Sequence, residues 1–155
     1  MIRPYSKEDR QELEHFLMRQ HTFARLNGQS IQEFRDENVA DFEEDGTVSL
    51  IIREDGRIVA IADLLKRHPV DGSLWLGLFV VEETFHGTGL AQTLYEQVEE
   101  GYMRPHQTVF RLGVLPGNLR ARRFWERNGY VYEKDSTTNK DMRVHVLKKQ
   151  LIRPE

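Results

Sequence analysis

Leu76–Leu94, with the sequence LGLFVVEETFHGTGLAQTL, is the stretch that decides the fold. An apolar run ends here at two acidic residues, passes into a loop with two glycines and continues as a helical pattern. Glycine lets a bulky ligand come close to the main chain, and the free N–H groups at a helix start attract anions. This order predicts a phosphate-binding loop over His86, Gly87, Thr88, Gly89, Leu90 and Ala91, although an ordinary strand–loop–helix turn has the same pattern.

The spacing of the glycines does not fit the two common nucleotide loops. A P-loop needs Lys followed by Ser or Thr after its last glycine, but Leu90 and Ala91 follow Gly89. A dinucleotide loop needs a third glycine or alanine where Gln92 stands. The spacing does match Q/R-x-x-G-x-G/A, with His86, Gly89 and Ala91 in the three defined places.

That pattern resembles the coenzyme A pyrophosphate loop of the Gcn5-related N-acetyltransferase (GNAT) superfamily, and the resemblance extends over the whole chain. A second stretch, VLPGNLRARRFWERNGYVYE from Val114, is similar to the superfamily's N-x-x-A-x-x-x-Y-x-x-x-G-F block, with Asn118, Ala121, Gly129 and Tyr130 in register. Trp125 departs from it, because many members carry there the tyrosine proposed to protonate the coenzyme A thiolate. An apolar stripe of Ala121, Phe124 and Trp125 also explains this helix by core packing.

The other patterns predict short elements in β-α-α-β-β-β-α-β-α-β-β order. Strands are expected at 2–4, 48–53, 57–65, 74–81, 108–114, 130–134 and 142–147. Helices are expected after Ser6, over 30–42, after Gly89 and from Leu119, with loops at 21–29 and 135–141. The fold class is therefore α/β (an α+β mixed sheet), flanked by about four helices. The resemblance implies the acyl-CoA N-acyltransferase fold.

Composition indicates one soluble domain. With 155 residues, 39% of them apolar, the chain is long enough for one core and too short for two ordinary domains, so we expect a single N-acetyltransferase domain over 1–155. The absence of an apolar run of about twenty residues and of a signal pattern predicts a cytoplasmic protein without membrane contact. The chain has no cysteine and no H-E-x-x-H motif, so we expect no metal. A net charge of −3 argues against nucleic acid as a partner.

The resemblance also implies where acetyl-CoA, the expected cosubstrate, lies. The strand before the loop would splay from its neighbour, and the main chain of Phe79, Val80 and Val81 would face the pantetheine arm. Asn118 and Trp125 would contact the coenzyme. The Val81 N–H would then serve as the oxyanion donor for the thioester.

Acetyl transfer to an amine needs a base more than an acid. An alkyl ammonium has a pKa of about 10, whereas a model thiol has one of about 8.5 and leaves as a fairly stable anion. Glu82 and Glu83 end the strand where the superfamily often has a catalytic carboxylate, and register slightly favours Glu82. Both are equally explained as exposed strand-end residues, and Asp63 and His86 are alternatives.

The expected acceptor is a primary amine of a small molecule or peptide. Residues 32–45 carry seven acidic side chains and one arginine, which would favour cationic acceptors or form a solvated helix face. The function predicted first is therefore an acetyl-CoA-dependent N-acetyltransferase. The alternatives are a coenzyme A-binding sensor or interaction module without turnover, and transfer of a longer acyl group. The protein could assemble as a homodimer.

Overall fold

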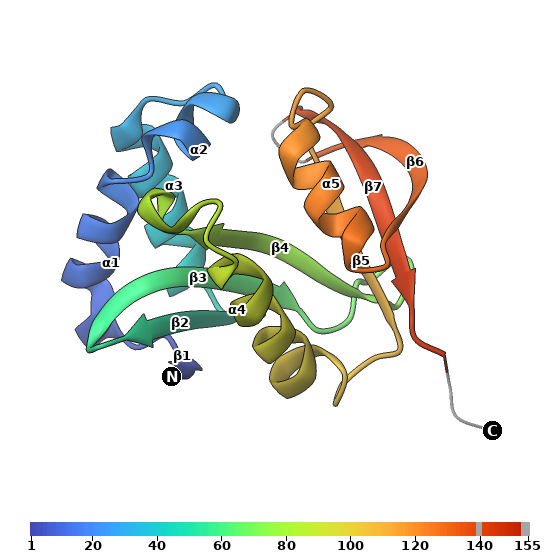
Figure 1. The fold of residues 1–155 in the computed structure, drawn as a ribbon, viewed down its shortest axis with the longest axis horizontal. Helices are drawn as coiled ribbons and strands as arrows, with labels where there is room; N and C mark the ends of the chain where they lie inside the picture. The colour runs from blue at the N-terminus through green and yellow to red at the C-terminus, as the bar shows by residue number, and fades with distance from the viewer. Residues whose placement is uncertain (139–140, 153–155) are drawn as a thin grey trace.

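The computed structural model describes residues 1–138 and 141–152 as a mixed sheet with helices on both faces (Figure 1). The seven strands lie in the order β1-β2-β3-β4-β5-β7-β6. All neighbouring pairs are antiparallel except β4 and β5, which are parallel. The mixed sheet expected from the sequence is confirmed. No helix among the described residues is long and apolar enough to cross a membrane.

The strands are β1 (Ile2–Pro4), β2 (Val48–Glu54), β3 (Arg57–Leu65), β4 (Leu74–Val81), β5 (Val109–Val114), β6 (Val131–Thr137) and β7 (Arg143–Gln150). The limits of β3 and β4 agree with those expected. The loop predicted over 135–141 is too long, because β6 continues to Thr137; positions 139–140 of that loop lie outside the described residues. Every residue of β6 is exposed, so apolar alternation could not mark where this edge strand ends.

The helices are α1 (Arg10–Met18), α2 (His21–Leu26), α3 (Ile31–Glu43), α4 (Leu90–Val98) and α5 (Leu119–Arg127). The loop expected over 21–29 is wrong, since α2 occupies most of it, and the flanking α-helices number five. Gln20, the residue before α2, makes no side-chain cap. Ser30 and Glu33 form the expected capping box at the start of α3. A π-helical turn, Glu99–Met103, continues α4.

The core has two layers, one on each face of the sheet. One cluster packs beneath α1 and α3 and contains Phe16, Phe34, Ile51, Ile61 and Val80. The other packs beneath α4 and α5 and contains Leu50, Leu76, Leu94, Phe110 and Trp125. Burial of β4 between these layers explains its apolar sequence.

β4 and β5 separate soon after they meet. They pair only at Leu74 with Phe110 and at Trp75 with Arg111. On its other edge, β4 stays paired with β3 as far as Val81, with a bulge at Gly77 where Leu76 and Leu78 face Leu64 and Asp63. A bulge bends its strand and increases the twist. The two parallel strands therefore diverge toward their carboxyl ends, which is the splay that the family resemblance implies.

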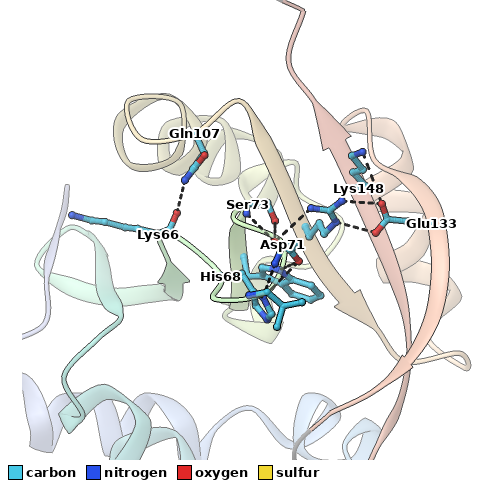
Figure 2. Close-up of polar contacts among 10 residues, drawn as sticks. Lys66, His68, Asp71, Ser73, Gln107, Glu133 and Lys148 are labelled. Atoms are coloured by element: carbon cyan, nitrogen blue, oxygen red, sulfur yellow. Dashed lines mark hydrogen bonds and ion pairs between the residues drawn. The ribbon is translucent and has the colours of Figure 1, made fainter.

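A polar network holds the closed end of this splay. Arg111 of β5 makes two hydrogen bonds to the Glu133 carboxylate, of 2.9 and 3.0 Å, and lies 3.6 Å from Asp71 in the β3–β4 loop. Asp71 also accepts from the Ser73 hydroxyl and from the Trp75 indole N–H. Figure 2 shows Asp71 and Ser73 on one side of this network and Glu133 on the other. The network therefore joins the two halves of the sheet where β4 and β5 meet.

Acid should weaken this network through Asp71. Burial acts to raise the pKa of its carboxyl, but hydrogen bonds from Ser73 and Trp75 outweigh burial and hold that pKa at about 2. A pKa below that of the unfolded chain contributes stability above about pH 4, which is lost as the pH falls toward 2. The unfolding free energy should fall with acid in the wild type. In Asp71→Asn we expect that fall to be smaller by about 2 kcal/mol.

Urea unfolding at a series of pH values between 2 and 7 tests this expectation. Asp55→Asn is the control, because Asp55 is an exposed residue of the β2–β3 turn with a φ of 51°, a conformation that asparagine tolerates. Equal slopes for wild type and Asp71→Asn below pH 4 would contradict the assignment.

Candidate active site

The free edge of β4 presents main-chain groups to the splay. Glu82 N–H donates to Val59 O at 2.8 Å, which makes Glu82 and Val59 a hydrogen-bonded pair across β3 and β4. Hydrogen-bonded pairs alternate along an antiparallel ladder, so Val80 also faces β3, whereas Phe79 and Val81 face away from it. β5 has already diverged at that level. The N–H and C=O groups of Phe79 and Val81 therefore point into the splay.

The glycine loop follows β4 after Glu82 and the short turn Glu83–Phe85, and it leads into α4. Gly87 and Gly89 have φ values of 81° and 87°, which explains why glycine stands at both positions. Gly89 is the N-cap of α4, and the Thr88 hydroxyl accepts from Leu90 N–H at 3.3 Å. A helix start leaves several N–H groups without an intrahelical partner, and it attracts anions. The helix start thus has the local geometry that the sequence predicted for an anion-binding loop.

His86 folds back from this loop onto the end of β4. Its Nε2 atom lies 3.0 Å from the Val81 carbonyl oxygen, while the residue as a whole is exposed. His86 thus contacts the main chain that the resemblance assigns to the pantetheine arm. This contact does not favour a role for His86 as the catalytic base over a structural role in the loop.

Aromatic side chains line the splay on the α4 and α5 face. Phe79 of β4 lies 5.9 Å from Trp125 and 6.4 Å from Phe124 between ring centroids. Trp125 also contacts Tyr95 and Tyr130, and it is 8% exposed. Trp125 is thus a core residue that packs between β4 and α5, and its contact with the coenzyme remains a prediction.

Asn118 begins α5 in the manner expected of a cap. Its side-chain oxygen accepts from Ala121 N–H at 3.1 Å. At the other end, Gly129 has a φ of 94°, and Tyr130 N–H donates to Trp125 O. Since capping fully explains Asn118, its contact with a coenzyme remains a prediction.

Glu82 is buried in an ion pair that sequence analysis did not anticipate. Arg19, at the end of α1, binds its two carboxylate oxygens with Nε at 3.0 Å and Nη2 at 2.9 Å. This hydrogen bond is also the main reason why the pKa of Arg19 is raised. Glu82 is 4% exposed. A carboxylate whose oxygens are both held by a guanidinium is poorly suited to accept a proton.

Glu83 is more open. It is half-buried, and its Oε1 atom accepts from the Thr22 N–H of α2. Its own N–H donates to the Gln20 side-chain oxygen at 3.2 Å. The partners of Glu82 and Glu83 lie in or beside the segment expected to be a loop; they are Arg19, Gln20 and Thr22. Nothing in the sequence around them indicates contacts with residues about sixty positions away.

Asp63 does not face the splay. Its carboxylate accepts from the Ser49 hydroxyl of β2 at 2.9 Å, and burial raises its pKa. Asp63 pairs in register with Leu78, four positions before Glu82, and its carboxylate is engaged by β2, which separates it from the carboxylates at the end of β4.

The acidic residues of 32–45 are dispersed around α3. Glu33 caps the helix, Asp36 pairs with Arg35, and Glu43 accepts from the Tyr5 hydroxyl. Glu43 and the two acids after it line a hollow of about 670 Å³ beside β1 and the π-helical turn, and no residue of the glycine loop lines it. The structure thus shows several local roles for these carboxylates and no single acidic cleft at the splay. Among the described residues, no group of three or more histidine, aspartate or glutamate side chains is arranged to hold a metal ion.

Comparisons with known proteins agree with this geometry. The model of the acetyltransferase (GNAT) family matches residues 10–130. No curated protein matches the chain in sequence. Similar solved structures include an acetyltransferase from Thermus thermophilus, with a TM-score of 0.80, 16% identity and coverage of 97% of this chain and 96% of that chain. The ribosomal-protein-S18-alanine N-acetyltransferase from Escherichia coli has a TM-score of 0.71 and 16% identity, with coverage of 100% of this chain and 96% of that chain. PaiA N-acetyltransferase from Thermoplasma acidophilum in complex with coenzyme A has a TM-score of 0.70 and 15% identity, with coverage of 97% of this chain and 98% of that chain.

Proposed function

Because the chain belongs to the acetyltransferase (GNAT) family, we propose that it transfers an acetyl group from acetyl-CoA to a primary amine of a small molecule or peptide. The observation that carries this proposal is the unpaired edge of β4, which presents Phe79 and Val81 to the splay and continues into the glycine loop. The PaiA neighbour was solved with coenzyme A, and the name of the Escherichia coli neighbour describes transfer to an alanine of a protein.

Acetyl-CoA would bind as an added strand along β4. Its pantetheine amides would pair with the main chain of Phe79 and Val81, in the way that an extended peptide adds to a sheet edge. Its pyrophosphate would contact the loop from His86 to Ala91, where the N–H groups at the start of α4 are directed outward. Trp125 and Phe79 would bound the thioester from the α5 side.

The reaction then requires proton removal and stabilisation of an oxyanion. The amine nitrogen attacks the thioester carbonyl carbon, the carbonyl oxygen becomes an oxyanion, and the carbon–sulfur bond breaks to release the thiolate. The Val81 N–H is the proposed oxyanion donor, because it faces the splay. Glu83, directly or through water, is a better candidate than Glu82 to take the ammonium proton, since Arg19 occupies both oxygens of Glu82.

Trp125 acts in this proposal as a wall and not as an acid, because an indole N–H does not ionise usefully near neutral pH. Turnover by Trp125→Phe should stay within about tenfold of wild type, which corresponds to about 1.4 kcal/mol in the barrier. Steady-state kinetics at saturating acetyl-CoA measure this. A loss of a thousandfold with unchanged acetyl-CoA binding would show that Trp125 takes part in the chemistry.

Radiolabelled acetyl-CoA and a panel of primary amines test the proposed function. Activity should rise with pH through the mildly alkaline range, because each pH unit below the amine pKa costs about 1.36 kcal/mol to deprotonate the acceptor. Binding of acetyl-CoA without label transfer to any amine would favour the interaction module, and faster reaction with longer acyl-CoA esters would favour the broader acyltransferase. Absence of coenzyme binding would overturn all three assignments.

A further inference from the structure

The junction between α1 and α2 is bonded to the end of β4 at four points. Arg19 makes two hydrogen bonds to the Glu82 carboxylate, Gln20 accepts from Glu83 N–H, and Thr22 N–H donates to the Glu83 carboxylate. The paired residues are more than sixty positions apart in sequence. We name the residues 19–22 and 82–83 the β4 clamp.

Two residues of the β4 clamp, Gln20 and Glu82, are buried, whereas the Arg19 side chain is 48% exposed and Thr22 is exposed. Gln20 is fully buried, and its side-chain amide N–H₂ donates to Phe16 O at 2.9 Å while its oxygen accepts from Glu83. Glu82 is buried as well, so losing the Arg19 guanidinium would leave a carboxylate without compensation in the protein interior. The contacts of the clamp therefore hold the junction between α1 and α2 in one position relative to β4.

The clamp lies between the two sides of the proposed site. Glu82 follows Val81, the proposed oxyanion donor, and Glu83 begins the short turn Glu83–Phe85 that leads to the glycine loop. On the other side of the clamp, α2 begins at His21. In Figure 1, α2 and α5 stand on opposite sides of the open end of the splay. The clamp therefore lies next to the position proposed for the thioester.

We propose that Arg19 is a positioning residue for the amine acceptor, because its ion pair with Glu82 fixes the junction between α1 and α2 next to Val81. This inference rests on the proposed acetyltransferase function. The clamp contacts Glu82 and Glu83, which follow β4, whereas Val80 holds the strand to β3 and the main-chain groups of Phe79 and Val81 stay directed into the splay. The clamp therefore acts on acceptor binding and leaves coenzyme binding unchanged.

The experiment compares Arg19→Leu and Glu82→Gln with the wild type. Displacing a positioning element by about 1 Å can cost about a hundredfold in rate, so we expect the KM for the amine to rise by about tenfold or more in Arg19→Leu. The Kd for acetyl-CoA should stay within about threefold, as calorimetry would show. Arg10→Leu is the matched control, because Arg10 is an exposed residue of the same helix that bonds Glu14 at 3.0 Å and not β4.

The pH profile separates this role from that of a base. Arginine cannot serve as a base at these pH values, so a clamp predicts that Arg19→Leu and Glu82→Gln raise KM alike and keep the alkaline rise of activity. If Arg19→Leu does not fold, Arg19→Leu/Glu82→Leu replaces both members of the pair by apolar side chains, so that no buried carboxylate remains, and the same increase in KM is expected.

Wild-type kinetics in these folded variants would overturn the inference, and so would a flattened pH profile in Glu82→Gln alone or an equal loss of acetyl-CoA affinity. Each of those results requires an active wild type. Failure of the proposed function would appear instead as a wild-type protein that transfers no acetyl group.

Discussion

Gly89→Val is expected to abolish measurable binding of acetyl-CoA. The φ of 87° at Gly89 is strained for valine, and such a residue costs about 1–3 kcal/mol. A Cβ at this position would meet no protein atom within 4 Å, so it would project into the open surface of the loop where the pyrophosphate is proposed to lie. We expect the Kd to rise at least about a hundredfold, or roughly 2.7 kcal/mol, in calorimetric titrations.

Gly46→Val provides a matched control for backbone strain. Gly46 has a φ of 102°, and a Cβ there would also meet no protein atom within 4 Å, but it lies after α3 and outside the glycine loop. Its substitution should lower stability similarly while leaving the Kd for acetyl-CoA unchanged. Equal affinities for Gly89→Val and Gly46→Val would remove the loop from the coenzyme site.

Lys149→Met should be strongly destabilising. Glu99 begins the π-helical turn, is 6% exposed and accepts hydrogen bonds from Lys149, Arg104 and the Tyr95 hydroxyl. Removing one partner of a buried ion pair typically costs about 3–5 kcal/mol, and because Arg104 remains we expect about 3 kcal/mol. For a chain of this size that corresponds to a fall in Tm of about 6–12 °C, measurable by calorimetry or circular dichroism.

Two comparison variants make the expectation specific. Arg104 is half-exposed, so Arg104→Met should cost about 1 kcal/mol or less. Lys149→Met/Glu99→Leu should recover stability relative to Lys149→Met, because the buried carboxylate is then gone and the Arg104 guanidinium is half-exposed to water. A double variant that is less stable than Lys149→Met would contradict the buried-charge explanation.

The sequence predicted those helices and strands whose ends are set by a nearby turn, cap or glycine residue. The turn at Asp55 and Gly56 gives both residues positive φ values of 51° and 78°, so the limits of β3 could be read from the sequence. The same holds for α5, which starts at the Asn118 cap and ends before Gly129. The glycine loop was predicted because its two positive φ values require glycine.

The elements that were missed depend on contacts distant in sequence. α2 has six residues and no side-chain cap, and Thr22 N–H at its start is satisfied by Glu83. Burial of Glu82 requires Arg19, which is 63 residues away. Sequence register therefore favoured Glu82 as a base, whereas the structure shows a carboxylate whose oxygens are already engaged.

The two tryptophans of the chain occupy opposite ends of the splay. Trp75 lies at the closed end, where its indole N–H binds Asp71, and Trp125 lies in the aromatic wall beside Phe79. Indole emission depends on its surroundings, so a ligand entering the open end alters the light from one ring and leaves that of the other as an internal reference. With Trp75→Phe and Trp125→Phe to assign each signal, the unlabelled protein becomes its own optical reporter of coenzyme entry, suited to stopped-flow measurements.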